Sequence, residues 1–233
     1  MFETLLSKTL FILAVSLFFC ILGALGVLRY FRTAFANGKE YVRAGVNKEG
    51  ELDLVVEQSV LSKVFWPAFI FNIITFIGLL FFRRAEYLNF ILMCLFTFSD
   101  GITIGVVLIN MDENLGVKVT GITAMVTLLA SLIGMYSGVD FSFLKEFLFI
   151  GLIILICISI FRIFVSIKGV KRKVCAGLGI LIFIGYLLFD FNMLSKAQDV
   201  EVLNNWNVAL DFAIDIYLDI INLFLDILDM LSD

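Results

Sequence analysis

Long uninterrupted apolar runs divide this sequence into seven segments. Within each run the apolar residues follow one another without the alternation that a β-barrel strand shows, and a bilayer leaves no water to satisfy open backbone groups. A helix that crosses the hydrocarbon core needs about 20 mostly apolar residues. We therefore predict an all-α integral membrane protein with seven transmembrane helices, at about residues 9–28, 64–82, 87–109, 119–136, 147–161, 174–189 and 206–231.

One polar segment interrupts this pattern, at about residues 29–63. Its charged residues predict a long polar loop or a surface helix, inserted into a single polytopic membrane domain of residues 1–233. The dipeptides Asn37-Gly38 and Glu49-Gly50 are typical of turns. Lys and Arg gather in the loops after the first, third and fifth runs, which places the N-terminus outside and the C-terminus inside.

Composition excludes several classes of function. Of the 233 residues, 61% are hydrophobic and 16% are charged, and the mean hydropathy of +1.06 excludes a water-soluble globule. The chain has no histidine, so it lacks an imidazole base, a His-ligated zinc and a Ser-His or Cys-His nucleophile pair. Its four cysteines stand alone in apolar runs, where a thiol packs as a small hydrophobe. The net charge of -4 does not suggest nucleic acid. We expect neither an enzyme nor a nucleic-acid partner.

The last apolar run carries a row of acidic residues. Successive members are 4, 4, 3, 4, 3 and 4 residues apart, which is the α-helical period. At about 100° per residue the row covers an arc of roughly 120°, and the rest of the helix is apolar. The row consists of Asp211, Asp215, Asp219, Asn222, Asp226, Asp229 and Asp233. Carboxylates that cannot face lipid must face water, a cation or a protonated partner, and hard cations such as Ca²⁺ prefer oxygen ligands.

Two other interpretations of this row are open. The helix could lie on the membrane surface, although surface helices usually carry Lys and Arg on the polar face and this face has neither. Asp229 and Asp233 could be simply the solvated end of the chain. We expect the first three members, Asp211, Asp215 and Asp219, and with them Asp226, to face water, a cation or a protonated partner.

Two more acids lie deep in apolar runs. Asp100 falls midway through the third run, and Asp190 ends the sixth. An ionisable residue inside a membrane is a candidate functional residue because its insertion costs roughly 2.5 to 3.5 kcal/mol. Asp190 could instead be a boundary residue that reaches the headgroups, and Asp100 could belong to a structural pair. Arg83 and Arg84 are typical topological anchors, and either could pair with these acids.

Three stretches of the sequence form a recognisable set. They are Arg83-Arg84 with residues 96–103 (Phe-Thr-Phe-Ser-Asp-Gly-Ile-Thr), residues 186–192 (Tyr-Leu-Leu-Phe-Asp-Phe-Asn) and residues 216–225 (Ile-Tyr-Leu-Asp-Ile-Ile-Asn-Leu-Phe-Leu). Together they resemble the transmembrane Bax inhibitor motif family, also called the Bax inhibitor-1 family, and the chain looks like a bacterial-type member. The third stretch is the most specific, because it matches the closing signature of that family almost residue for residue.

The resemblance implies a seven-helix fold with the last helix central in the bundle, and an activity as a pH-sensitive calcium leak channel. By motif position, Asp190 and Asp219 would form a hydrogen-bonded pair that senses protons and binds Ca²⁺ transiently. Arg83, or the neighbouring Arg84, would be the latch that binds this pair. The family often has an acidic residue at the position of Asp100. No tightly bound cofactor is implied, and Ca²⁺ is the permeant ion. We assign to the cation pathway Asp100, Asp211, Asp215, Asn222 and Asp226.

The sequence departs from the family pattern in two places. Asp190 and Asp219 are 29 residues apart, which is a longer separation than is common in the family. A longer loop at residues 193–205 would absorb the difference, but Asp215 then competes with Asp219 as the partner of Asp190. We prefer Asp219 because it lies inside the closing signature. The polar segment at residues 29–63 is the second departure, and it could cap one mouth of the protein.

A mechanism follows if the two aspartates approach each other at a constriction. Two carboxyl groups that are close together in a poorly solvated site do not ionise together easily. A singly protonated pair would hold the sixth and seventh helices together through an O–H···O bond. Full ionisation would separate them by repulsion and attract Ca²⁺. We therefore expect the current to depend on pH.

A function of another class is the alternative. The protein could bind and regulate another membrane protein, such as a protease or a cell-death regulator, without conducting ions. An intramembrane aspartyl protease is disfavoured because Gly177-Leu178-Gly179 is followed by Ile180, where that chemistry needs an aspartate. The expected partners are therefore the lipid bilayer, Ca²⁺, protons and a possible membrane protein. The chain ends without a basic retrieval tail, which favours a bacterial plasma (inner) membrane over the endoplasmic reticulum.

Overall fold

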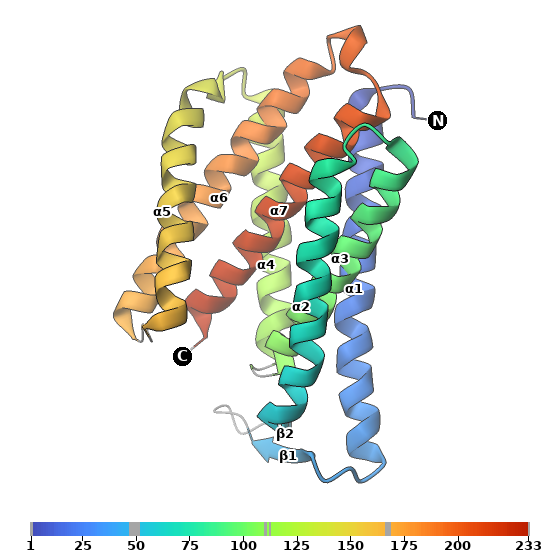
Figure 1. The fold of residues 1–233 in the computed structure, drawn as a ribbon. Coiled ribbons are helices and arrows are strands. Elements are labelled where there is room, and N and C mark those ends of the chain that lie inside the picture. The colour runs from blue at the N-terminus through green and yellow to red at the C-terminus, as the bar shows by residue number, and fades with distance from the viewer. Residues whose placement is uncertain (1, 47–51, 110, 112, 166–168, 233) are drawn as a thin grey trace. The chain divides into compact units, whose positions relative to one another are not determined.

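Each of the seven apolar runs forms an α-helix. The computed structural model describes residues 2–46, 52–109, 111, 113–165 and 169–232. Figure 1 shows the elements, which are in chain order α1 (Leu5–Ala36), β1 (Val42–Val46), β2 (Leu52–Val56), α2 (Gln58–Phe81), α3 (Glu86–Ile109), α4 (Glu113–Tyr136), η1 (Phe141–Phe143), α5 (Leu144–Phe164), α6 (Val170–Ala197), η2 (Glu201–Leu203) and α7 (Trp206–Leu231). Both η elements are short 3-10 helices. The α-helical prediction is confirmed.

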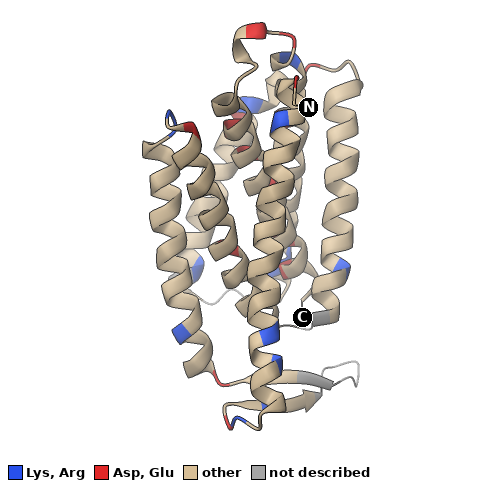
Figure 2. Ribbon diagram, turned by 90° about the vertical axis from the view of Figure 1, so that its right-hand side faces the viewer, with Lys and Arg blue, Asp and Glu red and all other residues tan. Residues whose placement is uncertain are grey.

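Six helices, α1 to α6, are long and apolar enough to cross a membrane among the residues that the structure describes. Figure 2 shows that these helices are largely free of charge along their length, with the Lys, Arg, Asp and Glu positions mainly near helix ends and in the connections. Helix α7 is not among the six, and it is the helix that carries the acidic row. The fold is therefore that of a multi-span membrane protein. The seventh span and the central position of α7 stay predictions.

The contacts of the chain divide it into two compact units, which we describe one by one. The hairpin unit comprises Phe11–Gly116, with most of α1, both strands, α2 and α3. The aspartate unit comprises Met1–Leu10 and Val117–Asp233, with most of α4 and all of α5, α6 and α7. The single membrane domain predicted for residues 1–233 stays a prediction.

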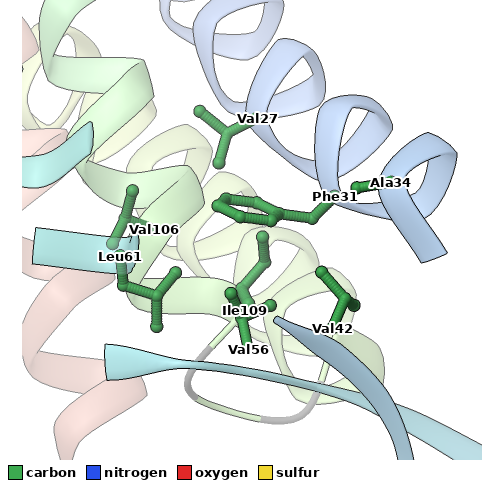
Figure 3. Packing of buried hydrophobic residues seen from close by; sticks show 8 residues of the cluster. All are labelled: Val27, Phe31, Ala34, Val42, Val56, Leu61, Val106 and Ile109. Atoms are coloured by element: carbon green, nitrogen blue, oxygen red, sulfur yellow. The ribbon is translucent and has the colours of Figure 1, made fainter. Parts of the chain in front are cut away.

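A β-hairpin occupies the segment at residues 29–63, which we had expected to be a polar loop or a surface helix. Helix α1 continues to Ala36, β1 and β2 pair in antiparallel register, and α2 begins at Gln58. Val42 lies opposite Val56, and both side chains are buried. Figure 3 shows them packed in one apolar cluster with Val27, Phe31, Ala34, Leu61, Val106 and Ile109. In β2, Leu54 and Val56 contact this cluster while Val55 between them is exposed, which is the alternation of a strand with one buried face.

The structure describes one of the two turns predicted in this segment. Gly38 has a φ of +67°, so the turn at Asn37-Gly38 uses the left-handed backbone conformation that glycine adopts easily. The Glu49-Gly50 turn lies outside the described residues.

Helices α1 and α3 of the hairpin unit pack backbone against backbone. A Cβ atom at Gly101 would overlap the carbonyl oxygen of Cys20, and one at Gly23 would overlap that of Phe98. Helix α2 is joined to α3 by a polar contact, because Asn72 Nδ2 donates to the Phe96 carbonyl oxygen at 3.2 Å. Small residues and interhelical hydrogen bonds are the usual means of helix association inside a membrane.

In the aspartate unit, α6 lies beside both α5 and α7 (Figure 1). Helix α4 also approaches α6 closely, because a Cβ at Gly134 would lie 2.7 Å from the Leu188 carbonyl oxygen. The start of α7 is capped by Asn205, whose Oδ1 accepts from the Val208 N–H at 3.0 Å. Lys8 Nζ donates to the Asn204 carbonyl oxygen at 2.9 Å, which ties the first turns of α1 to the start of α7.

Candidate functional site

Asp190 of α6 and Asp219 of α7 form a buried acid pair. Their side chains are 8% and 7% exposed, and each carboxyl group is a hydrogen-bonding partner of the other. Helix α6 continues to Ala197, so Asp190 lies inside the helix and does not end it. The alternative that Asp190 is a boundary residue near the headgroups stays a prediction. The structure brings together the two residues that the sequence motifs paired, while their proton-sensing role stays a prediction.

Asp215 lies one turn before Asp219 on α7, and its side chain is exposed. Its charge acts on both Asp190 and Asp219, whereas the hydrogen bond of the pair joins those two residues. Asp219 is thus the geometric partner of Asp190. The longer separation in sequence is absorbed by the extra turns of α6 and by η2, in place of the loop expected at residues 193–205.

A cavity of about 600 Å³ opens beside the acid pair, between α5, α6 and α7. We call it the aspartate cleft. Its apolar wall includes Phe149, Leu152, Phe183, Phe189 and Leu218. Its polar lining consists of Lys145, Glu146, Tyr186, Asp190, Asp215, Asp219 and Asn222. The cleft therefore exposes a concentrated set of carboxylates to a space that is large enough for several water molecules.

One carboxyl oxygen of the pair has no hydrogen-bonding partner among the described residues. Asp219 Oδ2 is buried and receives no hydrogen bond from a donor in the described part of the chain. A buried polar atom without a partner is costly, so a proton, a water molecule or a cation on this oxygen would lower the free energy of the site. Among the described residues, no group of three or more His, Cys, Asp and Glu side chains could hold a metal ion. Transient Ca²⁺ binding by Asp190 and Asp219 stays a prediction.

Asn192 supports the pair from two residues along α6. Its Nδ2 donates to the carbonyl oxygens of Gly134 and Val139, both at 3.0 Å, and its Oδ1 accepts from the Phe141 N–H at 3.2 Å. The side chain is 7% exposed. Sequence reasoning included Asn192 in a motif without giving it a role. Its position next to Asp190 in an apolar run was the available signal, because a buried amide must find partners.

The end of the acidic row is paired with arginines, so the interpretation of Asp229 as a solvated end is wrong. Asp229 Oδ2 accepts from Arg162 Nη2 at 3.0 Å, and its Oδ1 accepts from Arg172 Nε at 2.5 Å. The Asp229 side chain is 15% exposed. Asp226, one turn earlier, lies against Gly179 of α6, where a Cβ atom would overlap its carboxylate. Asp233 lies outside the described residues.

The remaining candidate residues do not take part in the hydrogen bond of the acid pair. Asp211 is half-buried on α7, and Asn222 donates from Nδ2 to the Leu218 carbonyl oxygen at 2.8 Å. Asp100 is half-buried on α3, and Arg83 and Arg84 are exposed in the turn between α2 and α3. These last three residues belong to the hairpin unit. The latch and the contribution of Asp100 to a pathway stay predictions.

The burial of α7 does not fit a helix on the membrane surface. Asp219, near the middle of the acidic row, is buried and faces α6, although a surface helix would turn that face to water. The apolar face is buried as well, since Ile216, Tyr217 and Leu223 are 0% exposed. Helix α7 therefore buries Asp219 together with these three apolar side chains.

The long apolar helices and the internal carboxyl pair define a class, the multi-pass α-helical membrane proteins. A family model described as "Inhibitor of apoptosis-promoting Bax1" matches residues 3–233, so the chain belongs to the Bax inhibitor-1 family. The chain is 27% identical over 173 residues to Protein LIFEGUARD 1 of Arabidopsis thaliana, covering 73% of this chain and 71% of that protein. It is 30% identical over 165 residues to Bax inhibitor 1 of Schizosaccharomyces pombe, covering 70% and 59%.

A bacterial relative is also similar. The chain is 26% identical over 171 residues to an uncharacterized protein of Helicobacter pylori, covering 72% of this chain and 71% of that protein. These matches confirm the resemblance that the motifs indicated.

Proposed function

We propose that this chain is a pH-sensitive calcium leak channel in which Asp190 and Asp219 form the gate. The observation that carries the proposal is the buried pair at the aspartate cleft, where Asp219 Oδ2 lacks a hydrogen-bond donor among the described residues. With one proton, the pair is joined by an O–H···O bond that holds α6 against α7. Without that proton, two like charges repel at close range, and the cleft offers its carboxylates to a cation.

The composition of the cleft supports a cation as the permeant species. Its acidic members outnumber its single basic member, Lys145. Clefts lined by one sign of charge concentrate the counter-ion, and rings of Asp and Glu are typical of cation channels. Asp215 and Asn222 are part of this lining on α7, and we assign Asp226 and Asp211 to the pathway on either side of it. Ca²⁺ is the cation that we propose, since it accepts carboxylate, carbonyl and water oxygens in flexible geometry.

Calcium flux into liposomes of pure lipid tests this proposal against its rival. The family description names inhibitors of apoptosis-promoting Bax1, which favours as a second candidate a membrane protein that restrains another protein. A channel conducts in pure lipid, whereas a regulator needs its partner. We expect a flux that rises from about pH 6 to about pH 8, as the pair loses its proton. Folded, correctly inserted protein that gives no flux above empty liposomes would contradict the channel and favour the regulator.

A further inference from the structure

One face of α5 and one face of α7 line the aspartate cleft. Their lining positions follow the helical spacing of three and four residues, so each helix contributes a single stripe of side chains. The stripes are Lys145, Glu146, Phe149 and Leu152 on α5, and Asp215, Leu218, Asp219 and Asn222 on α7. A different face of α5 packs on α6, since a Cβ at Gly151 would lie 2.9 Å from Ile182 Cδ1. The cleft is therefore a built part of the helix packing.

Most of the apolar wall of the cleft is aromatic. Phe149, Phe183 and Phe189 belong to it, and the ring centroids of Phe183 and Tyr186 are 6.4 Å apart. A small inorganic cation such as Ca²⁺ binds oxygen atoms and makes no use of such a wall. An organic cation uses it in two ways, because its apolar part is removed from water and its charge is attracted to aromatic faces. The volume of about 600 Å³ is typical of a small-molecule pocket.

The carboxyl groups of the cleft select the charged end of such a ligand. Asp219 lines the cleft and is 7% exposed, and its Oδ2 receives no hydrogen bond from the described residues. An ammonium group brings a positive charge and several N–H donors, which are what a buried carboxylate without a donor requires. Hydrogen bonds between two charged groups are stronger than neutral ones. The cleft therefore combines a charged site with an apolar wall, and an ammonium ion with an apolar body satisfies both.

We propose that the aspartate cleft binds an organic ammonium ion, that is, a protonated primary amine with an apolar or aromatic body. The ammonium group lies against Asp190 and Asp219, and the body lies against the aromatic wall. A ligand in this position occupies the carboxylates that would receive Ca²⁺, so it blocks the calcium flux. The block rests on the proposed channel function, whereas the binding itself does not.

Two probes of nearly equal shape test the binding on the unaltered full chain in detergent micelles. 4-Phenylbutylamine is an ammonium ion at about pH 8, since alkyl amines of this kind have a pKa near that of lysine. 4-Phenylbutan-1-ol has the same apolar body and no charge. We expect calorimetric titration to show saturable binding of the amine, at least about tenfold tighter than that of the alcohol. Equal binding of the two probes would show simple partitioning into apolar surface and would overturn the proposal.

Two pairs of variants locate the bound amine. Asp219→Asn keeps the shape of the side chain and should weaken the amine by at least about tenfold, while Asp140→Asn, outside the cleft lining, should not change it. Phe149→Leu keeps an apolar wall and should weaken the amine about threefold, because it removes one aromatic face. Phe147→Leu is its control, because Phe147 is exposed on the same helix and does not line the cleft. Equal effects within either pair would place the amine outside the cleft and refute the site.

Calcium flux into liposomes separates this inference from the channel. We expect 4-phenylbutylamine to reduce the wild-type flux by about half at the concentration that occupies half of the protein, and the alcohol to leave it unchanged. A conducting wild type that the bound amine does not inhibit would refute the block. A pH-dependent flux without amine binding would refute the inference and leave the channel intact. Amine binding without any flux would support the ligand site and refute the channel. If Asp219→Asn does not fold, the two probes and the Phe149→Leu pair still decide the binding.

Discussion

Asn192 donates a hydrogen bond to the carbonyl oxygen of Gly134, which joins α6 to α4 within two residues of Asp190. Its other bonds, to Val139 and Phe141, fix the connection that leads into α5. Because α5 supplies one wall of the aspartate cleft, we expect this amide to support the geometry of the cleft from outside it. The acid pair thus has a hydrogen-bonded amide close by in an otherwise apolar region.

Replacing Asn192 by alanine should destabilise the protein. Three backbone groups would lose their partners, and each unsatisfied buried group costs about 1 to 3 kcal/mol. We expect Asn192→Ala to lower the free energy of unfolding by roughly 2 to 4 kcal/mol, measured by denaturant unfolding in detergent. Ser131→Ala is the control, because the Ser131 hydroxyl donates to Leu128 within its own helix. Equal stability of the two variants would show that the Asn192 bonds do not support the cleft.

Asp215 and Asp219 should differ in what they control. Asp219 shares the hydrogen bond with Asp190, while Asp215 acts on the pair through its charge. We expect Asp219→Asn to remove the pH response of calcium flux, and Asp215→Asn to lower the flux while keeping the response. Flux recordings in liposomes at several pH values test this. The opposite assignment, with the response lost in Asp215→Asn, would make Asp215 the true partner.

Gly101 should be irreplaceable, and Gly26 should not. A methyl group at Gly101 would overlap the backbone of Cys20, whereas nothing lies within 4 Å of a Cβ at Gly26. We expect Gly101→Ala to destabilise the protein by about 1 to 3 kcal/mol or more, because two helix backbones must separate. Gly26→Ala, in the opposing helix, should be neutral or stabilising by up to about 1 kcal/mol. Thermal unfolding midpoints compare the two, and similar midpoints would contradict the close packing of α1 and α3.

Asp140 provides a matched control for the acid pair. It lies in the connection before α5, and its bonds with Lys196 and Ser142 hold the pKa of its carboxyl well below the ordinary value. A carboxyl group whose pKa is lower in the folded than in the unfolded state stabilises the fold at pH values above its unfolded pKa. This contribution is lost as the pH falls through the folded pKa. From about pH 6 to about pH 8 the carboxylate therefore stays ionised. We expect Asp140→Asn to keep the pH response of flux, and a lost response would mean that the profile reports general electrostatics.

The helices could be predicted from the sequence because a membrane imposes long apolar segments. The end of α6 could not be predicted, because the polar residues that follow Asp190, such as Ser195 and Lys196, are typical of a loop. In the fold they remain helical, and Lys196 is held by Asp140. The hairpin was missed because its strands have five residues each inside a charged segment. The strands can be recognised only once Val42 and Val56 are seen to pack in one apolar cluster.

The acid pair could be proposed from the motifs around Asp190 and Asp219, because a local signature marks each one. The walls of the cleft could not be predicted from the sequence, because Lys145 and Glu146 lie in no such signature. The contact of Arg162 with Asp229 was also beyond sequence reasoning, because the two residues are 67 positions apart. Pairing over such a separation is decided by how the helices pack.

The most direct test of the central claim is the pH profile of calcium flux through Asp190→Asn in liposomes, compared with Asp140→Asn. The acid pair cannot share a proton once Asp190 is an amide, so the account predicts a flux that no longer changes from about pH 6 to about pH 8. Asp140→Asn should keep the wild-type rise over the same range. A folded Asp190→Asn protein with the full wild-type profile would contradict the claim that this pair is the gate.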